Sequence, residues 1–488
     1  MHPRSIAAPD PASSLPLVVD LDGTLIRTDM LHESCVQLFR SAPLNVCRLP
    51  WWLRHGKAAL KQEVARRTRF NAALLPYNEE FLQWLRQQHG AGRRLVLCTA
   101  SDRSQADAVA EHCGFFDEVI ASDGTVNLDG QNKAQALVRR FGAGQFDYAG
   151  NSAVDLHVWR EARQAVVVGA SASVVARASA SCATEKVFPA RSANWRTWSR
   201  MLRVHHWLKN LLLFAPLFAA HRLADVSSWV NLLWAFAAFS LCASSVYVAN
   251  DLMDLESDRQ HPRKRGRAFA AGAVDIWVGV ALVPVLAMAS VALASLVSAE
   301  LLSWLCAYWV LTWLYSWWLK RLAIVDCLTL AGLYTLRVVA GAVAAGLALS
   351  FWLLAFSAFL FLSLAFLKRY AELKVQEAAG KSSAHGRGYL TSDAPLIQTM
   401  GVVSGYTSAV VLALYLNSEA VLRLYRTPEL IWGAVAVLVY WVSWIWLRAS
   451  RGQVHDDPLV FAIKDKASLA AGLIFGLVLL LGSAGLPW

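Results

Sequence analysis

Residues 229–267 read WVNLLWAFAAFSLCASSVYVANDLMDLESDRQHPRKRGR. An apolar run of about 20 residues, long enough to cross roughly 30 Å of hydrocarbon as a helix, leads directly into a polar segment. That segment is first acidic and then basic. Acids at a membrane edge are costly and usually functional. The stretch therefore predicts a spanning helix that carries a charged site to one membrane surface.

The C-terminal half of the chain repeats this apolar pattern. Hydrophobic residues make up 56% of the 488 residues and charged residues 17%, against roughly 45–50% and 25% in soluble proteins. This composition excludes a disordered protein and argues against an ordinary soluble enzyme. We predict an all-α, polytopic membrane bundle over 205–488 with nine transmembrane helices, at about 207–222, 229–249, 273–297, 301–318, 322–345, 350–367, 396–416, 428–447 and 468–486.

The basic residues orient this bundle. The net charge of +11 could indicate nucleic acid, but the Lys and Arg of this half lie mostly in short loops between apolar runs. With the N-terminal half inside, the inner loops carry 16 of them and the outer loops carry 3, namely Arg222, Arg423 and Arg426. This positive-inside bias predicts a multi-pass protein of the bacterial cytoplasmic (inner) membrane, with its polar motifs on the cytoplasmic side and no nucleic-acid partner.

The first 204 residues have a different composition. Residues 1–14 lack the apolar core of a signal peptide and are predicted to be a disordered leader. Residues 15–190 have soluble composition, and 191–204 form a basic, Trp-bearing linker to the membrane part.

Short apolar strands in the soluble part end in polar motifs. LVVDLDGTL (17–25), RLVLCTAS (94–101), FDYAGNSAVD (146–155) and AVVVG (165–169) each read as a buried strand or a strand-to-loop element. Alternating strands and helices predict a Rossmann-like α/β domain with a doubly wound parallel sheet. Ligands of such sheets gather at the carboxyl ends of the strands.

The motifs at these strand ends suit phosphoryl chemistry. An Asp-x-Asp pair can hold Mg²⁺ while one carboxylate acts as nucleophile and the other as acid and base. The pattern resembles the haloacid dehalogenase (HAD) phosphatase superfamily over roughly residues 15–175. The resemblance implies that Asp20 is nucleophile and metal ligand, and that Asp22 is general acid/base and ligand through its carbonyl. Thr99, Ala100 and Lys133 would bind phosphate.

The fourth motif departs from this family. It reads Gly150-Asn151-Ser152, where an Asp is common at the Asn151 position, and Asp155 follows. Asn151 and Asp155 are therefore the remaining candidate metal ligands, and an amide oxygen can still bind Mg²⁺. The stretch of about 30–85 would be a helical cap, which either screens a lipid substrate or only completes the core.

The acidic segment after the second apolar run predicts a second metal site. Its Asp residues have i, i+3, i+7 spacing, which places them on one helical face, where they repel one another unless a cation joins them. Mg²⁺ bound to a diphosphate satisfies this need, and the basic tail would bind phosphate oxygens. The candidates are Asn250, Asp251, Asp254 and Asp258 for the metal, and Lys264, Arg265 and Arg267 for phosphate.

This Asn-Asp-x-x-Asp-x-x-x-Asp motif resembles the UbiA-type prenyltransferase superfamily. That resemblance implies nine helices and transfer from a Mg²⁺-bound diphosphate. The usual second Asp-rich motif is replaced by LKRYAEL (367–373), which has one acid. With RVHHWLKN (203–210) and the basic tail, the chain resembles the decaprenyl-phosphate phosphoribosyltransferase branch. Its substrates would be 5-phosphoribosyl-1-diphosphate and a polyprenyl phosphate.

Two anionic substrates require several cations and hydrogen-bond donors. The predicted substrate-binding residues of the membrane half are Lys209, Asn210, Lys320, Arg337, Lys368, Arg369, Tyr370, Glu372, Arg387 and Tyr389. Arg337 lies in an apolar run and serves either the acceptor phosphate or a structural pair. Asp326 is about 16 Å away along a straight helix and is not expected to pair with it directly. The charges of the last inner loop (Asp456, Asp457, Lys464 and Asp465) are expected to be solvated.

The combined hypothesis is a two-step enzyme. Asp251 and Asp254 would act in phosphoribosyl transfer to a polyprenyl phosphate, and Asp20 and Asp22 would remove the 5-phosphate of the product. One alternative is a prenyltransferase with an aromatic acceptor and an inactive or regulatory HAD domain. Another is a transporter or scaffold with the HAD fold as a sensor. A homo-oligomer is left open.

Overall fold

The computed structural model describes residues 15–190, 193–382, 387–418, 425–454 and 457–484. The chain forms two compact units. The first contains the residues up to 202 together with 247–283, and the second contains 203–246 and the residues from 284 onward. The predicted leader 1–14, together with Arg423 and Asp456, lies outside the described residues.

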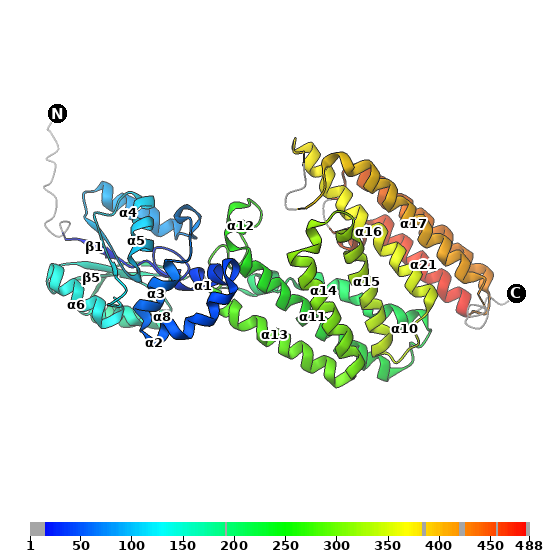
Figure 1. Ribbon diagram of the computed structural model, residues 1–488, viewed down its shortest axis with the longest axis horizontal. Helices are drawn as coiled ribbons and strands as arrows, with labels where there is room; N and C mark the ends of the chain where they lie inside the picture. Colours follow the sequence, from blue (N-terminus) through cyan, green and yellow to red (C-terminus); the bar gives the residue numbers. More distant parts are fainter. Residues whose placement is uncertain (1–14, 191–192, 383–386, 419–424, 455–456, 485–488) are drawn as a thin grey trace, which may run out of the picture. The chain divides into compact units, whose positions relative to one another are not determined.

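A six-stranded parallel sheet forms the centre of the first unit, as the sequence predicts (Figure 1). The strand order is β3-β2-β1-β4-β5-β6, and every neighbouring pair is parallel. The strands are β1 (Leu17–Val19), β2 (Leu95–Asp102), β3 (Glu118–Ser122), β4 (Asp147–Gly150), β5 (Gln164–Val168) and β6 (Ala183–Phe188). Because the chain leaves β1 toward β2 on one side and returns to β4 on the other, the carboxyl end of β1 is the switch point where such sheets bind ligands.

Helices cover both faces of this sheet. Successive side chains of a strand point to opposite faces, so Leu17 and Val19 join one core with Phe81, while Val18 joins the other with Leu137. Burial on both faces explains why β1 is wholly apolar. The covering helices are α4 (Glu79–Gly90) and α5 (Arg103–Cys113) on one face, and α6 (Gly130–Phe141), α7 (Leu156–Trp159) and α8 (Ala172–Ser181) on the other.

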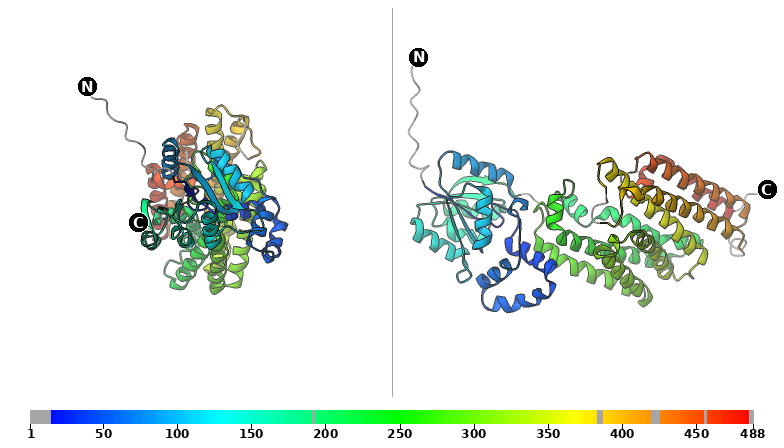
Figure 2. Two further views of the ribbon diagram at one scale, coloured as in Figure 1. Left: turned by 90° about the vertical axis from the view of Figure 1, so that its left-hand side faces the viewer. Right: turned by 45° about the horizontal axis from the view of Figure 1, so that its top comes forward.

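A small helical subdomain follows β1 in the chain. Helices α1 (Met30–Ser41), α2 (Leu49–Arg54) and α3 (Lys57–Ala65) gather beside the sheet (Figure 2). They share a core of their own, made of Leu38, Trp52 and Val64. Helix α4 begins inside the predicted cap of 30–85 but packs into the sheet core. The helical subdomain therefore ends before α4, earlier than predicted.

The first unit also contains the polar segment that follows the second apolar run. The end of α11 (Val226–Met253), the short helix α12 (Leu255–Gln260) and the start of α13 (Ile276–Val297) share one apolar cluster with α9 (Trp195–Met201). The predicted linker 191–204 therefore includes a helix. The apolar cluster is built from Met201, Val248, Leu252, Leu255, Ala268, Phe269, Val274 and Ile276.

The second unit is helical throughout its described part (Figure 1). Its helices are α10 (Ala215–Ala219), α14 (Ala299–Trp317), α15 (Val325–Ala344), α16 (Phe351–Ala378), α17 (Ala394–Leu416), α19 (Trp432–Ser450), α20 (Pro458–Lys464) and α21 (Lys466–Ala484). Among the described residues of the whole chain, seven helices are long and apolar enough to cross a membrane, namely α11, α13, α15, α16, α17, α19 and α21, with one-turn 3₁₀ extensions before α17 and α19.

The first predicted span does not form a single α-helix. Residues Val204–Phe214 are a 3₁₀ helix, η5, and only the short α10 follows. Such long 3₁₀ runs are uncommon. The neighbouring helix α15 approaches this segment closely, because a Cβ on Gly341 would be 1.9 Å from the carbonyl oxygen of Leu213. Backbone contact this close fixes η5 against α15 in a conformation that hydrophobic patterning does not reveal.

The fourth predicted span is a helix but not one of the seven apolar ones. Helix α14 has 19 residues, among them four Trp and two Tyr. Aromatic residues with a polar atom favour membrane interfaces and rank below aliphatic residues in hydropathy. The structure thus contains a long α-helix at eight of the nine predicted positions, and seven of these eight are both long and apolar enough to cross a membrane.

Candidate active sites

Asp20 lies at the carboxyl end of β1, where the strand order reverses. Its Oδ1 is 2.6 Å from the Nζ of Lys133, which α6 provides from the neighbouring βα unit. Its Oδ2 accepts a hydrogen bond from Thr24 Oγ1 at 3.2 Å. The Lys133 ammonium also donates to the hydroxyl of Tyr148 at 3.0 Å. The predicted nucleophile and the predicted phosphate-binding lysine are therefore adjacent and buried.

Asp22 connects the turn after β1 to strand β2 through hydrogen bonds. Its Oδ2 accepts hydrogen bonds from Ser101 Oγ at 2.6 Å and from Thr99 Oγ1 at 3.4 Å. Its Oδ1 accepts the backbone N–H of Met30, at the start of α1, at 2.8 Å. The sequence predicted Thr99 as a site residue and did not predict Ser101, although both belong to the motif 94–101.

The two candidate metal ligands of the fourth motif, Asn151 and Asp155, have different contacts. Both oxygens of Asp155 accept protein hydrogen bonds: Oδ1 from Tyr148, and Oδ2 from the backbone of Asn151 and from Ser152. The Asn151 amide lies against the turn after Asp20, because a Cβ on Gly23 would be 2.1 Å from its Nδ2. Asp155 thus shapes the loop, and Asn151 is the side chain that borders the Asp20–Asp22 turn.

Burial sets the protonation of this site. Burial raises the pKa of Asp20 to about 6, although Lys133 opposes the shift. Burial, with Asp29 and Asp20 nearby, raises the pKa of Asp22 to about 7. A carboxyl group with such a pKa holds a proton for part of the time at neutral pH and can donate it to a leaving group. The site has the parts of an acid–base phosphotransfer centre.

One lysine of the cap reaches this site and was not predicted. Lys61 of α3 donates to the carbonyl of Ala100 at 2.7 Å and to Asn127 Oδ1 at 3.3 Å. Ala100 lies between the two hydroxyl residues that contact Asp22. The sequence showed that the cap is rich in Lys and Arg, but no spacing marks Lys61 among them.

The Asp-rich segment brings two of its three aspartates together. Helix α11 ends at Met253, the chain turns at Asp254, and α12 begins at Leu255. Arg267 NH1 lies 3.1 Å from Asp251 Oδ1 and 2.6 Å from Asp258 Oδ2, so one guanidinium bridges two buried carboxylates. Arg265 is exposed, and Lys264 Nζ is 3.9 Å from Asp258 Oδ1.

The two buried carboxylates fit a cation. Burial raises the pKa of Asp258 against the effect of Arg267. Its Oδ1 is buried without a hydrogen-bond partner among the described residues. Within that part of the chain no three His, Cys, Asp or Glu side chains converge in a ready-made cage. The positive charge between Asp251 and Asp258 comes from Arg267 here, and a hard cation with oxygen preference suits the same place.

A second charged cluster lies in the helical unit and centres on Asp326. Arg369 NH2 is 2.6 Å from Asp326 Oδ2, and both residues are fully buried. Arg387 NH1 is 3.3 Å from the same oxygen, and Tyr389 donates to Oδ1 at 2.5 Å. Arg369 and Arg387 also pair with Glu372. Four predicted substrate-binding residues are thus gathered by an acid that sequence reasoning had considered only as a partner for Arg337.

Two further predicted substrate-binding residues, Tyr370 and Arg337, make contacts inside the helical unit. Tyr370 is buried in the apolar core, where its ring lies 5.9 Å from that of Trp446. Arg337 donates to Asn210 Oδ1 and Tyr308 Oη, each at 2.8 Å, and to the Leu333 carbonyl at 2.6 Å. No carboxylate within the described ranges pairs with Arg337. Neutral acceptors hold the guanidinium, and its predicted role, either with the acceptor phosphate or in a structural pair, stays a prediction.

The last inner loop is not uniformly solvated as expected. Asp457 is largely buried, with Lys209 Nζ at 2.5 Å and Lys368 Nζ at 3.3 Å. These two lysines lower the pKa of Asp457 well below its usual range, although burial alone would raise it. Asp465 caps the start of α21 through Ser468. Lys320 lies half-buried on the 3₁₀ turn Leu319–Arg321.

Comparison with known proteins identifies both halves. Residues 211–464 match the family described as UbiA prenyltransferase family, and residues 17–160 match haloacid dehalogenase-like hydrolase. An uncharacterized protein, y4nM, of Sinorhizobium fredii is 38% identical and covers 94% of this chain and 89% of its own length. The nodulation protein NoeC of Azorhizobium caulinodans is 36% identical over 58% of this chain and 93% of its own. The decaprenyl-phosphate phosphoribosyltransferase of Mycolicibacterium smegmatis is 31% identical over 55% of this chain and 86% of its own.

Proposed function

Because the chain belongs to the UbiA prenyltransferase family and carries an N-terminal haloacid dehalogenase-like domain, we propose that it transfers 5-phosphoribose from 5-phosphoribosyl-1-diphosphate to a polyprenyl phosphate and then removes the 5-phosphate. The relative named decaprenyl-phosphate phosphoribosyltransferase supports the first step. The HAD domain supports the second. The chain is a multi-pass membrane protein.

We propose 5-phosphoribosyl-1-diphosphate rather than a prenyl diphosphate as the donor because of the buried Arg369–Asp326 pair. A transferase of the general prenyl type would need a second acidic site at the 366–373 segment. Here that segment contributes a guanidinium whose charge is balanced by Asp326 and Glu372. The 366–373 segment offers one acid, Glu372, whereas the Asp-rich segment offers Asp251, Asp254 and Asp258. We therefore assign the diphosphate to the Asp-rich segment.

The chain's own residues would perform the transfer as follows. Asp251, Asp254 and Asp258, with Asn250, would hold Mg²⁺, which neutralises the diphosphate and the pyrophosphate that leaves. Lys264, Arg265 and Arg267 would bind phosphate oxygens of the donor. Lys209 and Lys368, which pair with Asp457 in this structure, would exchange that carboxylate for a second phosphate. The lipid phosphate oxygen attacks C1 of the ribose as the bond from C1 to the pyrophosphate oxygen breaks. The acceptor is already an anion, so no general base is needed.

The phosphatase step would use the site at the end of β1. Asp20 would attack the phosphorus of the 5-phosphate while Asp22 protonates the departing ribose oxygen, and water then releases phosphate from Asp20. Thr99, Ala100 and Lys133 would hold the transferred group. Asp20, the carbonyl of Asp22 and the side chain of Asn151 would bind Mg²⁺, and Asp155 would hold the Asn151 loop rather than the metal.

We also propose the following domains and topology. The HAD domain occupies 15–190, a linker 191–204 and the membrane domain 205–488. Nine crossings would consist of the seven apolar helices together with α14 and the η5–α10 segment. The HAD domain and both sites would lie on the cytoplasmic side of the bacterial inner membrane, as the distribution of Lys and Arg indicates.

A radiolabel transfer assay tests this function. Labelled 5-phosphoribosyl-1-diphosphate, a polyprenyl phosphate and Mg²⁺ are given to the purified full-length protein in detergent, with Asp251→Ala and Asp20→Asn beside it. We expect label in the lipid phase with the wild type and Asp20→Asn but not with Asp251→Ala, and phosphate release from that lipid only with the wild type. Transfer from a prenyl diphosphate to an aromatic acid, with none from the ribosyl donor, would contradict the proposal.

A further inference from the structure

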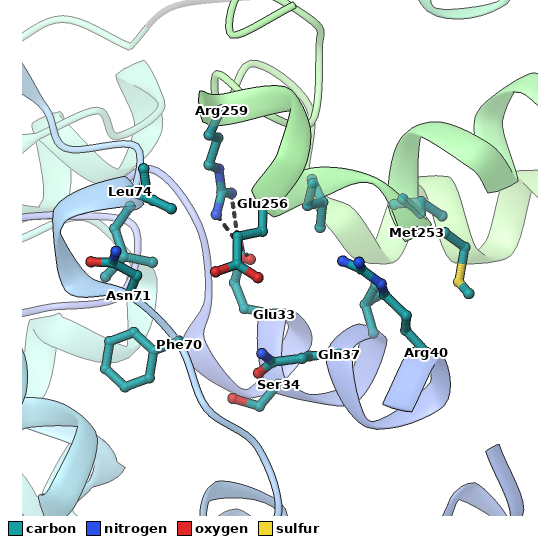
Figure 3. Close-up of a pocket in the computed structure, with 14 residues that line it drawn as sticks. Glu33, Ser34, Gln37, Arg40, Phe70, Asn71, Leu74, Met253, Glu256 and Arg259 are labelled. Atoms are coloured by element: carbon teal, nitrogen blue, oxygen red, sulfur yellow. Dashed lines mark hydrogen bonds and ion pairs between the residues drawn. The ribbon is translucent and has the colours of Figure 1, made fainter. Parts of the chain in front are cut away.

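The first cap helix of the HAD domain contacts the Asp-rich segment through a buried ion pair. Glu33 of α1 lies with Oε1 2.5 Å from NH2 of Arg259 and Oε2 3.1 Å from its NH1 (Figure 3). The two side chains are only 11% and 8% exposed. Arg259 directly follows Asp258 in α12. The pair therefore joins a phosphatase helix to the motif to which we assign diphosphate binding.

Both partners of this pair have a second contact. Glu33 Oε1 also accepts the hydroxyl of Thr28 at 2.9 Å, in the loop that leads from the Asp20–Asp22 turn to α1. Arg259 Nε donates to the carbonyl of Ala270 at 3.0 Å, beyond the basic tail. Arg259 thus ties the two ends of the segment that contains Asp258 and Arg267, and Glu33 fixes the orientation of its guanidinium.

Close packing surrounds the pair. Gly272 has φ of +63°, and a Cβ there would lie 2.6 Å from the Cβ of Arg27 and 2.9 Å from its carbonyl oxygen. Val36 of α1 packs against the apolar cluster at the end of α11. His32 is 3.4 Å from Asp275 and stacks on Trp277. Beside Glu33 a cavity of about 50 Å³ separates α1 from α12, so the ion pair, rather than continuous packing, spans the contact at that point.

We propose that Glu33 is a positioning residue for the Asp-rich site: through Arg259 it holds α12 so that Asp258 and Arg267 keep their arrangement. The phosphatase domain would then be a structural part of the transferase site. This inference rests on the proposed function for its kinetic consequence, but its structural consequence can be measured without any activity. Glu33 touches no reacting group in this scheme.

The physical expectation comes from the buried charge. Replacing Glu33 by Gln keeps the shape of the side chain but removes the charge that balances Arg259, and a buried charge without a partner is strongly unfavourable. Arg259 would turn toward another acid, of which Glu256 is the nearest candidate, because it lies three residues earlier in α12 and lines the same cavity. The geometry that binds the diphosphate would be disturbed, while the phosphatase residues around Asp20 would keep their contacts.

Two measurements on full-length protein in detergent test this. Hydrogen exchange of the 251–268 peptide should become several-fold faster in Glu33→Gln, and the KM for the diphosphate donor should rise several-fold with little change in kcat. The double charge swap Glu33→Arg with Arg259→Glu should recover part of both losses. The matched control is Glu63→Gln, because Glu63 pairs with Arg67 inside the cap and not with α12.

The outcomes separate the two proposals. Unchanged exchange of 251–268 in Glu33→Gln would overturn the positioning role, whatever the activity. Faster exchange with unchanged KM would also overturn it, because the contact would then be only a docking contact. If the wild type transfers no phosphoribose but Glu33→Gln still accelerates exchange, the proposed function fails and the hold of Glu33 on the segment stands.

Discussion

At the scale of single residues, the strand-end motifs were predictable and their connections were not. Asp20, Asp22 and Thr99 are each marked by a short apolar strand that ends in polar residues, and Lys133 by the start of a helix. The structure brings them together. Tyr148 lies inside strand β4, where it reads as an ordinary buried aromatic residue. Only the fold shows that its hydroxyl joins Lys133 to Asp155.

Tyr148→Phe should therefore weaken the phosphatase site in two ways. It leaves Asp155 Oδ1 and one Lys133 proton without a partner in a buried site, which should cost about 1–3 kcal/mol of stability. It also loosens Lys133, so phosphate release should slow while phosphoribosyl transfer stays unchanged. Thermal unfolding and a phosphate-release assay of the full-length protein measure both effects.

The matched control for that variant is Tyr77→Phe, because the buried Tyr77 hydroxyl has no hydrogen-bond partner among the described residues, Lys133 and Asp155 included. Equal losses from both variants would mean that burial of the hydroxyl, and not the bridge between Lys133 and Asp155, accounts for the change in stability.

The Asp326 cluster shows why pairwise reasoning along one helix fails. Arg337 and Asp326 share α15, and their separation correctly excluded a direct pair. The partner of Asp326 is Arg369 of α16, together with Arg387 from the loop after α16. Partners that come from different helices depend on packing, which the charge pattern of one segment does not contain.

At the scale of elements, hydrophobic runs predicted helices well and failed where backbones touch. Helices α11, α13, α15, α16, α17, α19 and α21 lie where apolar runs of sufficient length predict them. The η5 segment lies in a predicted span, yet it is a 3₁₀ helix, and its Leu213 carbonyl lies so close to α15 that only glycine fits at position 341. Hydropathy measures the solvent that a helix prefers and says nothing about the approach of a neighbouring backbone.

Gly341→Ala should accordingly disrupt η5. A methyl group placed 1.9 Å from a carbonyl oxygen cannot be accommodated without moving one of the two segments. Overpacking of this kind typically costs about 1–3 kcal/mol, and backbone contact places this case at the upper end. We expect a lower Tm in detergent and faster hydrogen exchange of 204–214.

Gly332→Ala on the same helix α15 is the control, because nothing lies within 4 Å of a Cβ there. A loss of Tm in Gly332→Ala equal to that in Gly341→Ala would show that α15 needs glycine flexibility rather than close contact with η5.

At the scale of the whole molecule, the contact within the first unit constrains the path of the chain through the membrane. The HAD domain packs α1 against residues at and after the end of α11, including Leu252 and Asp275. We therefore expect both to lie on one side of the membrane. If α11, which is 28 residues long and apolar enough to span a membrane, crosses once, the segment between Leu202 and α11 has to cross in the opposite direction. Only η5 and α10 are available there.

We therefore expect Leu223, between α10 and α11, on the far side of the membrane from the HAD domain. We expect a cysteine at Leu223 to react with a membrane-impermeant maleimide in intact cells, and a cysteine at Leu322, after the turn Leu319–Arg321, to react only once the membrane is permeabilised. Both leucines are exposed, and the native exposed Cys47 and Cys306 are first replaced by Ser. A protected cysteine at Leu223 would mean that η5 and α10 enter and leave on the same side. In that case the HAD domain and the Asp-rich segment would be separated by the bilayer, which is incompatible with the ion pair between Glu33 and Arg259.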